Sequence, residues 1–147
     1  MTDNSTSRRE GHCLCGAVKI TAKQAANHVG ACHCRMCRRW GGGPFLEIDC
    51  GTDVLIKGAE KISVYNSSDW AERAFCSACG TNLFYRLKGT GEHMVCAGIF
   101  DDADNDSLTF KTQVFIDEKP AYYSFAEDTD NMTGEELFAM IEGGQQE

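Results

Sequence analysis

The chain has 147 residues with 14 basic and 22 acidic side chains, which gives a formal net charge of −8. This balance disfavours nucleic-acid binding, because proteins that bind nucleic acid usually carry a basic face. No apolar run approaches the roughly 18 residues of a membrane span, and the polar first ten residues lack the apolar centre of a signal peptide. We therefore expect a cytoplasmic protein with a mobile polar tail at residues 1–10 and a single domain over residues 11–147.

Alternating apolar and polar residues predict short strands along most of the chain. The first predicted strand covers residues 12–20, with Cys13 and Cys15 on one face and Leu14 and Val18 turned toward a core. A second strand ends near residue 34, and a turn around Cys37 leads into a flexible glycine-rich loop at residues 41–44. Further strands are expected at residues 45–50, 54–56, 61–65, 93–100 and 108–116, with a hairpin over 71–87.

One helix is predicted, close to the C-terminus. Thr133 can cap its first turn, and Glu136 lies three residues later, in the position of a capping-box partner, before the apolar residues 137–141. Many short strands followed by one late helix predict a mainly β fold with one short C-terminal helix.

Nine cysteines carry the main chemical signal. An odd count fits a disulfide framework poorly, and clustered cysteines in a cytosolic protein more often bind metal or do chemistry. Zinc takes four donors at tetrahedral corners, and two cysteines around a tight turn can place both sulfurs on one ion. The closely spaced groups are Cys13-x-Cys15, Cys32-x-Cys34-x-x-Cys37 and Cys76-x-x-Cys79.

Two of these groups, far apart in the sequence, predict one four-cysteine zinc site, because ligation in two pairs ties distant segments together. We assign this site to Cys13, Cys15, Cys76 and Cys79, and Gly80 permits the backbone conformation that such a turn needs. Spacing alone leaves two alternatives open. In one, the third group supplies part of this site; in the other, the four cysteines are scattered buried thiols.

The third group, Cys32, Cys34 and Cys37, offers three ligands without an obvious fourth nearby. His33 lies between two of them, but on a strand its side chain points to the opposite face. Three protein ligands and one exchangeable position are typical of catalytic zinc, which can hold a thiolate at neutral pH or polarise a carbonyl oxygen. A zinc-free thiol cluster stays open, as does a structural site closed by a distant His28, Cys50, His93 or Cys96.

Three segments carry a family likeness: GHCLCG (Gly11–Gly16), CHCRMCR (Cys32–Arg38) and FCSACGT (Phe75–Thr81). They resemble the glutathione-dependent formaldehyde-activating enzyme family, which also includes centromere protein V. The resemblance implies a β-tent zinc fold and lyase-type addition of glutathione to formaldehyde, giving S-hydroxymethylglutathione. It also implies a structural zinc at the four-cysteine site and a catalytic zinc at Cys32, Cys34 and Cys37. One departure falls at Gln113, where many relatives have histidine.

The sequence therefore predicts a zinc-dependent carbon–sulfur lyase that adds a glutathione-like thiol to a small aldehyde such as formaldehyde. Two zinc sites are expected, and the second allows partial occupancy. Candidate substrate contacts are Arg35, Arg38, Arg39 and Trp40, because guanidinium groups bind carboxylates through paired hydrogen bonds. For the arginines, the alternative is a solvated charged face.

The alternative function is a non-catalytic binding or scaffold protein that zinc stabilises. The expected partners of the enzyme are a small-molecule thiol or aldehyde, with no nucleic acid and no membrane, and a homo-oligomer stays open. A thioredoxin-like redox role is disfavoured, because neither Cys-x-x-Cys pair follows a strand and opens a helix in a βαβ unit.

Overall fold

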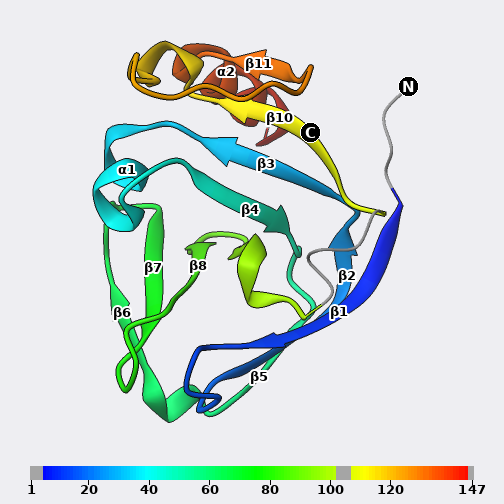
Figure 1. Cartoon of the computed structure of the whole chain (residues 1–147), viewed down its shortest axis with the longest axis vertical. Coiled ribbons are helices and arrows are strands. Elements are labelled where there is room, and N and C mark those ends of the chain that lie inside the picture. The colour runs from blue at the N-terminus through cyan, green and yellow to red at the C-terminus, as the bar shows by residue number, and fades with distance from the viewer. Residues whose placement is uncertain (1–4, 102–106, 146–147) are drawn as a thin grey trace. The chain divides into compact units, whose positions relative to one another are not determined.

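The computed structural model describes residues 5–101 and 107–145, and the chain forms two compact units. The first unit comprises Met1–His28 and Glu47–Thr109, and the second comprises Val29–Leu46 and Phe110–Glu147. Over the described residues strands outnumber helices, which confirms the predicted mainly β fold class (Figure 1). Among the described residues, no helix has the length and apolar character needed to cross a membrane.

The first unit contains two antiparallel groups of strands. One is a three-stranded sheet in the order β1 (Thr6–His12), β2 (Lys19–Ala26) and β5 (Val54–Lys57). The other runs in the order β4 (Phe45–Asp49), β9 (His93–Cys96), β8 (Asn82–Leu87), β7 (Ala71–Cys76) and β6 (Ile62–Tyr65), and the chain passes from the second unit into the first within β4. Short 3-10 turns occupy η1 (Ala59–Lys61) and η2 (Ala97–Ile99).

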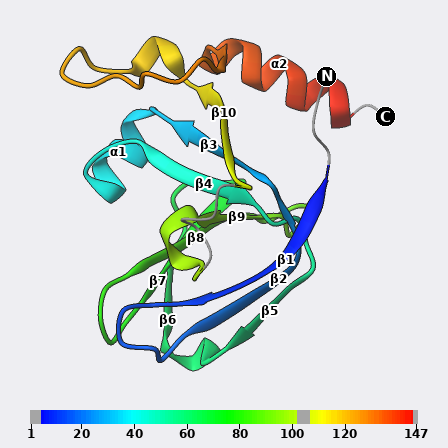
Figure 2. The ribbon, with the colours of Figure 1, turned by 45° about the vertical axis from the view of Figure 1, so that its right-hand side comes forward.

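Fully buried apolar side chains from these strands and their connections form the core of the first unit. Ile20 and Ala22 come from β2, and Leu83 and Val95 come from β8 and β9. The predicted hairpin over residues 71–87 is confirmed as β7 and β8, which pair in antiparallel register (Figure 2).

The single strand predicted over residues 12–20 is wrong, because a turn between β1 and β2 replaces it. The Cys13 N–H donates to the Val18 carbonyl at 3.0 Å, and the Gly16 N–H donates to the Cys13 carbonyl at 3.0 Å. Gly16 has a φ of 78°, a conformation that glycine adopts without strain. Leu14 is therefore 86% exposed instead of lying in the core, whereas Val18 is fully buried as predicted. Alternating polarity does not distinguish such a turn from a strand.

The polar tail predicted over residues 1–10 is wrong for residues 6–10. Residues 6–10 belong to β1 and pair with β2, and Arg9 is 2% exposed. Residues 1–4 lie outside the described part of the chain. The single domain over residues 11–147 stays a prediction.

The second unit contains the strand order β11 (Asp130–Met132), β10 (Thr109–Val114), β3 (His28–Cys32) and β4. β10 and β11 are parallel, with Gln113 opposite Asn131. The unit also includes α1 (Arg35–Gly41), η3 (Ile116–Glu118) and α2 (Gly134–Gln145).

The predicted capping box begins α2. The Thr133 hydroxyl accepts a hydrogen bond from the Glu136 N–H at 3.1 Å, and the Glu136 carboxylate accepts one from the Thr133 N–H at 3.0 Å. Two N–H groups that the helix itself leaves without partners are thereby satisfied. The short C-terminal helix is confirmed.

The turn predicted around Cys37 is a helix, α1. Cys34 is its N-cap residue, and Gly42 ends it with a φ of 85°. The segment has neither a Ser, Thr, Asp or Asn cap nor an apolar repeat, so the usual signs of a helix start are missing. The signs of its end are present, because two arginines in the last turn precede Gly42.

Candidate metal centres

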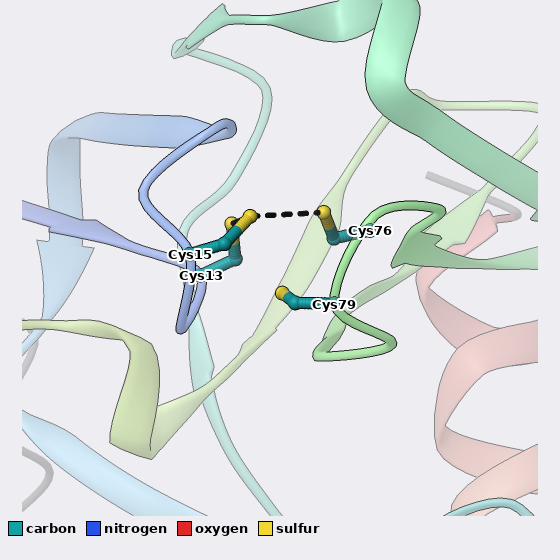
Figure 3. A group of neighbouring side chains, drawn as sticks. All are labelled: Cys13, Cys15, Cys76 and Cys79. Atoms are coloured by element: carbon teal, nitrogen blue, oxygen red, sulfur yellow. Dashed lines mark hydrogen bonds between the residues drawn. The ribbon is translucent and has the colours of Figure 1, made fainter.

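The first cluster consists of Cys13, Cys15, Cys76 and Cys79, all in the first unit. Their Sγ atoms all lie within 4.8 Å of one another. Cys13 and Cys15 are in the turn between β1 and β2, Cys76 ends β7, and Cys79 is in the turn before β8. Figure 3 shows the sulfurs of the two pairs facing each other, with Cys15 Sγ 3.9 Å from Cys76 Sγ. The two cysteine pairs that the sequence assigns to one site therefore do lie together.

The two cysteine-bearing turns share a hydrogen-bond pattern. In each, the N–H of the first cysteine donates to a carbonyl five residues later: Cys13 to Val18 at 3.0 Å and Cys76 to Thr81 at 2.9 Å. In each, the carbonyl of that cysteine accepts from a glycine with positive φ, Gly16 or Gly80. Backbone hydrogen bonds thus close both turns, and in the first turn Cys13 Sγ also accepts from the Val18 N–H at 3.3 Å.

Thr81 connects the two turns of the first cluster. Its hydroxyl lies 3.1 Å from Cys79 Sγ and accepts a hydrogen bond from the Leu14 N–H at 3.1 Å. The hydrogen bond from Thr81 lowers the pKa of Cys79 to about 5, with further help from backbone N–H groups. A thiolate at neutral pH is the form that binds metal. The FCSACGT motif contains Thr81, but its cysteine spacing gives the residue no role.

The second cluster consists of Cys32, Cys34 and Cys37 in the second unit, and their Sγ atoms also lie within 4.8 Å of one another. Cys32 ends β3, Cys34 caps α1, and Cys37 lies in the first turn of that helix. Cys34 Sγ accepts a hydrogen bond from the Cys37 N–H at 3.4 Å. Among the described residues of the second unit, no other cysteine, histidine, aspartate or glutamate joins this group.

The chemistry of the second cluster fits a bound cation. The pKa of Cys32 is raised above that of an ordinary thiol, because its sulfur shares hydrogen bonds with Cys34 and Cys37, and their charge repels a third thiolate. Three neighbouring thiols therefore cannot all ionise unless a positive charge compensates them. Both clusters could hold metal ions, and thiolates suit soft or borderline ions such as zinc.

His33 is fully buried, and both of its ring nitrogens have hydrogen-bond partners in the second unit. Nε2 lies 2.7 Å from Gln113 Oε1, and Nδ1 lies 2.9 Å from the Tyr123 hydroxyl. Burial lowers the pKa of His33, as do the nearby charges of Lys119 and Arg38. The sequence predicts no role for Gln113 or Tyr123, because nothing in it pairs them with a histidine 80 or 90 residues away.

The candidate substrate contacts lie on α1. Arg35 and Arg39 are exposed, whereas Arg38 is half-buried and its Nε donates to the His33 carbonyl at 2.9 Å. Trp40 packs edge-on against Phe45 with ring centroids 5.4 Å apart. Arg38 and Trp40 therefore have structural contacts of their own, and substrate binding by all four residues stays a prediction.

The other candidate ligands lie in the first unit. Cys50 is fully buried, and its Sγ donates to the Ile48 carbonyl at 3.4 Å. Burial and the charges of Asp49 and Glu47 raise the pKa of Cys50 to about 12, so this thiol stays protonated. The remaining candidates are Cys96 and His28, which are half-buried, and His93, which is buried.

Comparison with known proteins identifies the family. The model of the glutathione-dependent formaldehyde-activating enzyme family matches residues 8–118, a range that includes both clusters. The chain belongs to this family. A Schizosaccharomyces pombe protein named as an uncharacterized lyase is 36% identical over 133 residues, which cover 90% of this chain and 96% of that protein. The crystal structure of a Rhodobacter sphaeroides protein is similar at a TM-score of 0.55 and 25% identity, covering 69% of this chain and 99% of that one.

Proposed function

We propose that this member of the family is a zinc-dependent carbon–sulfur lyase that joins a glutathione-like thiol to a small aldehyde such as formaldehyde. The observation that carries the proposal is the second cluster, which offers three thiol ligands with no fourth in the described part of its unit. Catalytic zinc sites usually have three protein ligands and one exchangeable position. Membership of the family and the relative named as a lyase support the same reaction type.

In this proposal Cys32, Cys34 and Cys37 hold the catalytic zinc, and the first cluster holds a structural zinc. Zinc at the second cluster would supply deprotonation of a substrate thiol at neutral pH and polarisation of an aldehyde oxygen. The substrate sulfur bonds to the aldehyde carbon, the C=O double bond becomes a single bond, and the thiol proton ends on that oxygen. The reaction balances without an oxidant, a reductant or another co-reactant.

The chain's own residues would bind and orient the thiol substrate. Arg35 and Arg39 are one helical turn apart on α1, so they lie on the same side of the helix with exposed side chains. Guanidinium groups there suit a thiol that carries carboxylates, such as glutathione. Arg38 and Trp40 remain candidate contacts as well, and the bond from Arg38 Nε to the His33 carbonyl also ties α1 to the residue between Cys32 and Cys34.

The direct test is to mix the zinc-loaded protein with glutathione and formaldehyde and to follow formation of the adduct by NMR. We expect adduct to form faster than in the same mixture without protein. A rate equal to that background, in protein shown to contain two zinc ions per chain, would refute the proposal for formaldehyde.

The Cys34→Ser variant separates the enzyme from the alternative, a scaffold protein whose two zinc ions are both structural. Cys34 also caps α1, so a structural second site is the competing interpretation. The enzyme proposal expects lost activity with little change in Tm, whereas a structural site expects a clearly lower Tm. Cys50→Ala is the control, because it removes a buried thiol that lies outside both clusters.

Three further expectations belong to the same proposal. They are a β-tent architecture, a location in the cytoplasm and a small-molecule thiol or aldehyde as partner, with a homo-oligomer left open. Membership of the family supports the small-molecule partner.

A further inference from the structure

His33 has hydrogen-bond partners at all four of its polar atoms, and it lies between two members of the second cluster. Its N–H donates to the Val114 carbonyl at 3.1 Å, and its carbonyl accepts from Arg38 Nε at 2.9 Å. Its ring bonds to Gln113 and Tyr123. The residue is fully buried, and its ring stacks on that of Tyr123 with centroids 5.5 Å apart. The backbone between Cys32 and Cys34 is therefore fixed by contacts that involve no sulfur atom.

The hydrogen bonds of the His33 ring have a defined direction. The Thr129 hydroxyl donates to Asn131 Oδ1 at 2.6 Å and accepts from Gln113 Nε2 at 2.9 Å. This leaves Gln113 Oε1 facing His33, so the ring must donate from Nε2. Nδ1 is then an acceptor, and the Tyr123 hydroxyl donates to it. Each ring nitrogen of His33 therefore acts either as donor or as acceptor. Removing the side-chain group of Gln113 or Tyr123 leaves one buried nitrogen without its hydrogen bond.

We propose that Gln113 and Tyr123, acting through His33, are positioning residues that hold Cys32, Cys34 and Cys37 ready to bind metal. The inference rests on the proposed function, since it needs the second cluster to be a metal site. A loop that is already ordered pays less conformational entropy when it binds an ion. Residues that orient metal ligands typically change metal affinity by roughly 10- to 100-fold when they are replaced.

The test compares two neighbouring tyrosines. Tyr123→Phe removes only the hydroxyl that bonds to His33 and leaves the ring contacts in place. Tyr122→Phe is the matched control, because Tyr122 is 75% exposed and contacts Tyr123 only through its ring. Zinc affinity is measured by competition with a chelator, and cobalt(II) substitution reports thiolate ligation through its charge-transfer absorption. The Cys34→Ser variant identifies the signal of the second cluster.

We expect Tyr123→Phe to weaken zinc binding at the second cluster by roughly 10- to 100-fold and to leave the first cluster unchanged. Tyr122→Phe should bind like the wild type. Gln113→Leu should also weaken the second cluster, because His33 Nε2 then has no acceptor.

Wild-type affinity at the second cluster in both Tyr123→Phe and Gln113→Leu would overturn this inference and leave the proposed function standing. If Gln113→Leu does not fold, as judged by circular dichroism, Tyr123→Phe decides alone. A wild-type protein that binds no metal at the second cluster would overturn the proposed function and this inference together.

Discussion

The hydroxyl of Thr81 shows how one side chain can set the chemistry of a thiol. It accepts from the Leu14 N–H in one turn of the first cluster and bonds to Cys79 in the other. A threonine hydroxyl can do both, since it has one donor and two acceptor sites. The thiolate form of Cys79 is stabilised as a result, and its pKa falls to about 5. The ligand is thus prepared for metal before metal arrives.

Replacing Thr81 with valine should raise the pKa of Cys79, because the thiolate loses the hydrogen bond that stabilises it most. We expect it to move toward 9.0, the value of an ordinary thiol. At pH 7 less of the nucleophilic thiolate is then present, so alkylation by iodoacetamide slows. The measurement is the pH profile of alkylation at Cys79 in metal-free protein, mapped by mass spectrometry. Thr81→Ser keeps the hydroxyl and should keep the pH profile. An unchanged profile in Thr81→Val would show that the Thr81 hydroxyl does not lower the pKa of Cys79.

Among the elements, β1 depends on a glycine at its close approach to another segment. Gly11 bridges to Phe100, and a Cβ at this position would fall 2.7 Å from Phe100 Cα and 2.6 Å from the Ile99 carbonyl carbon. These are backbone atoms, which cannot move aside as a flexible side chain can. Gly11 lies two residues before Cys13, at the end of β1 that leads into the turn, so the position of β1 affects the first cluster.

Gly11→Ala should therefore destabilise the protein. Overpacking typically costs about 1–3 kcal/mol, which in a chain of this size lowers Tm by roughly 2–12 °C. Thermal unfolding followed by calorimetry measures the change. Gly98→Ala is the matched control, because a Cβ there meets nothing within 4 Å, and its Tm should stay close to that of the wild type. Equal Tm values for the two variants would show that β1 can shift to make room.

The sequence predicted elements with clear local signals and missed those whose local signals are ambiguous or unusual. The capping box of α2 and the hairpin of β7 and β8 follow from residues close together in the chain, and both are present. The turn at Cys13–Val18 was mistaken for a strand, because alternating polarity has the same appearance in both. The helix α1 was missed because a cysteine, an unusual cap, begins it.

For the candidate site, the sequence predicts what depends on residue spacing and not what depends on tertiary contacts. Cysteine spacing favoured the observed grouping of the sulfurs, because two closely spaced pairs suit a zinc ion with four ligands, although spacing alone left another combination open. The network around His33 could not be predicted, since Gln113 and Tyr123 come from β10 and from the segment after η3. Their hydrogen bonds depend on the tertiary fold, which composition and periodicity do not contain.

At the scale of the whole molecule, the two clusters belong to different compact units. They also differ in their readiness for metal. The first cluster has four sulfurs, and its Cys79 is a thiolate well below neutral pH. Its Cys15 is less ready: the Ala17 N–H lowers its pKa, but burial and hydrogen bonds with the other three cysteines raise it to about 11. The second cluster has three sulfurs, and the raised pKa of Cys32 opposes full ionisation.

Acidification should therefore remove zinc from the second cluster before the first. Metal binding needs thiolates, so protons compete with the ion. In the first cluster the lowered pKa values of Cys13 and Cys79 offset the raised pKa of Cys15. In the second cluster the shift at Cys32 is upward. Three donors also hold the ion less tightly than four. Zinc release at a series of pH values, followed with a chromogenic chelator, should show two steps as the pH falls from neutral. Cys34→Ser should remove only the step at higher pH, and Cys76→Ser only the step at lower pH. A single step in the wild type, or the opposite assignment in the variants, would show that the thiol pKa values and the number of donors do not govern release.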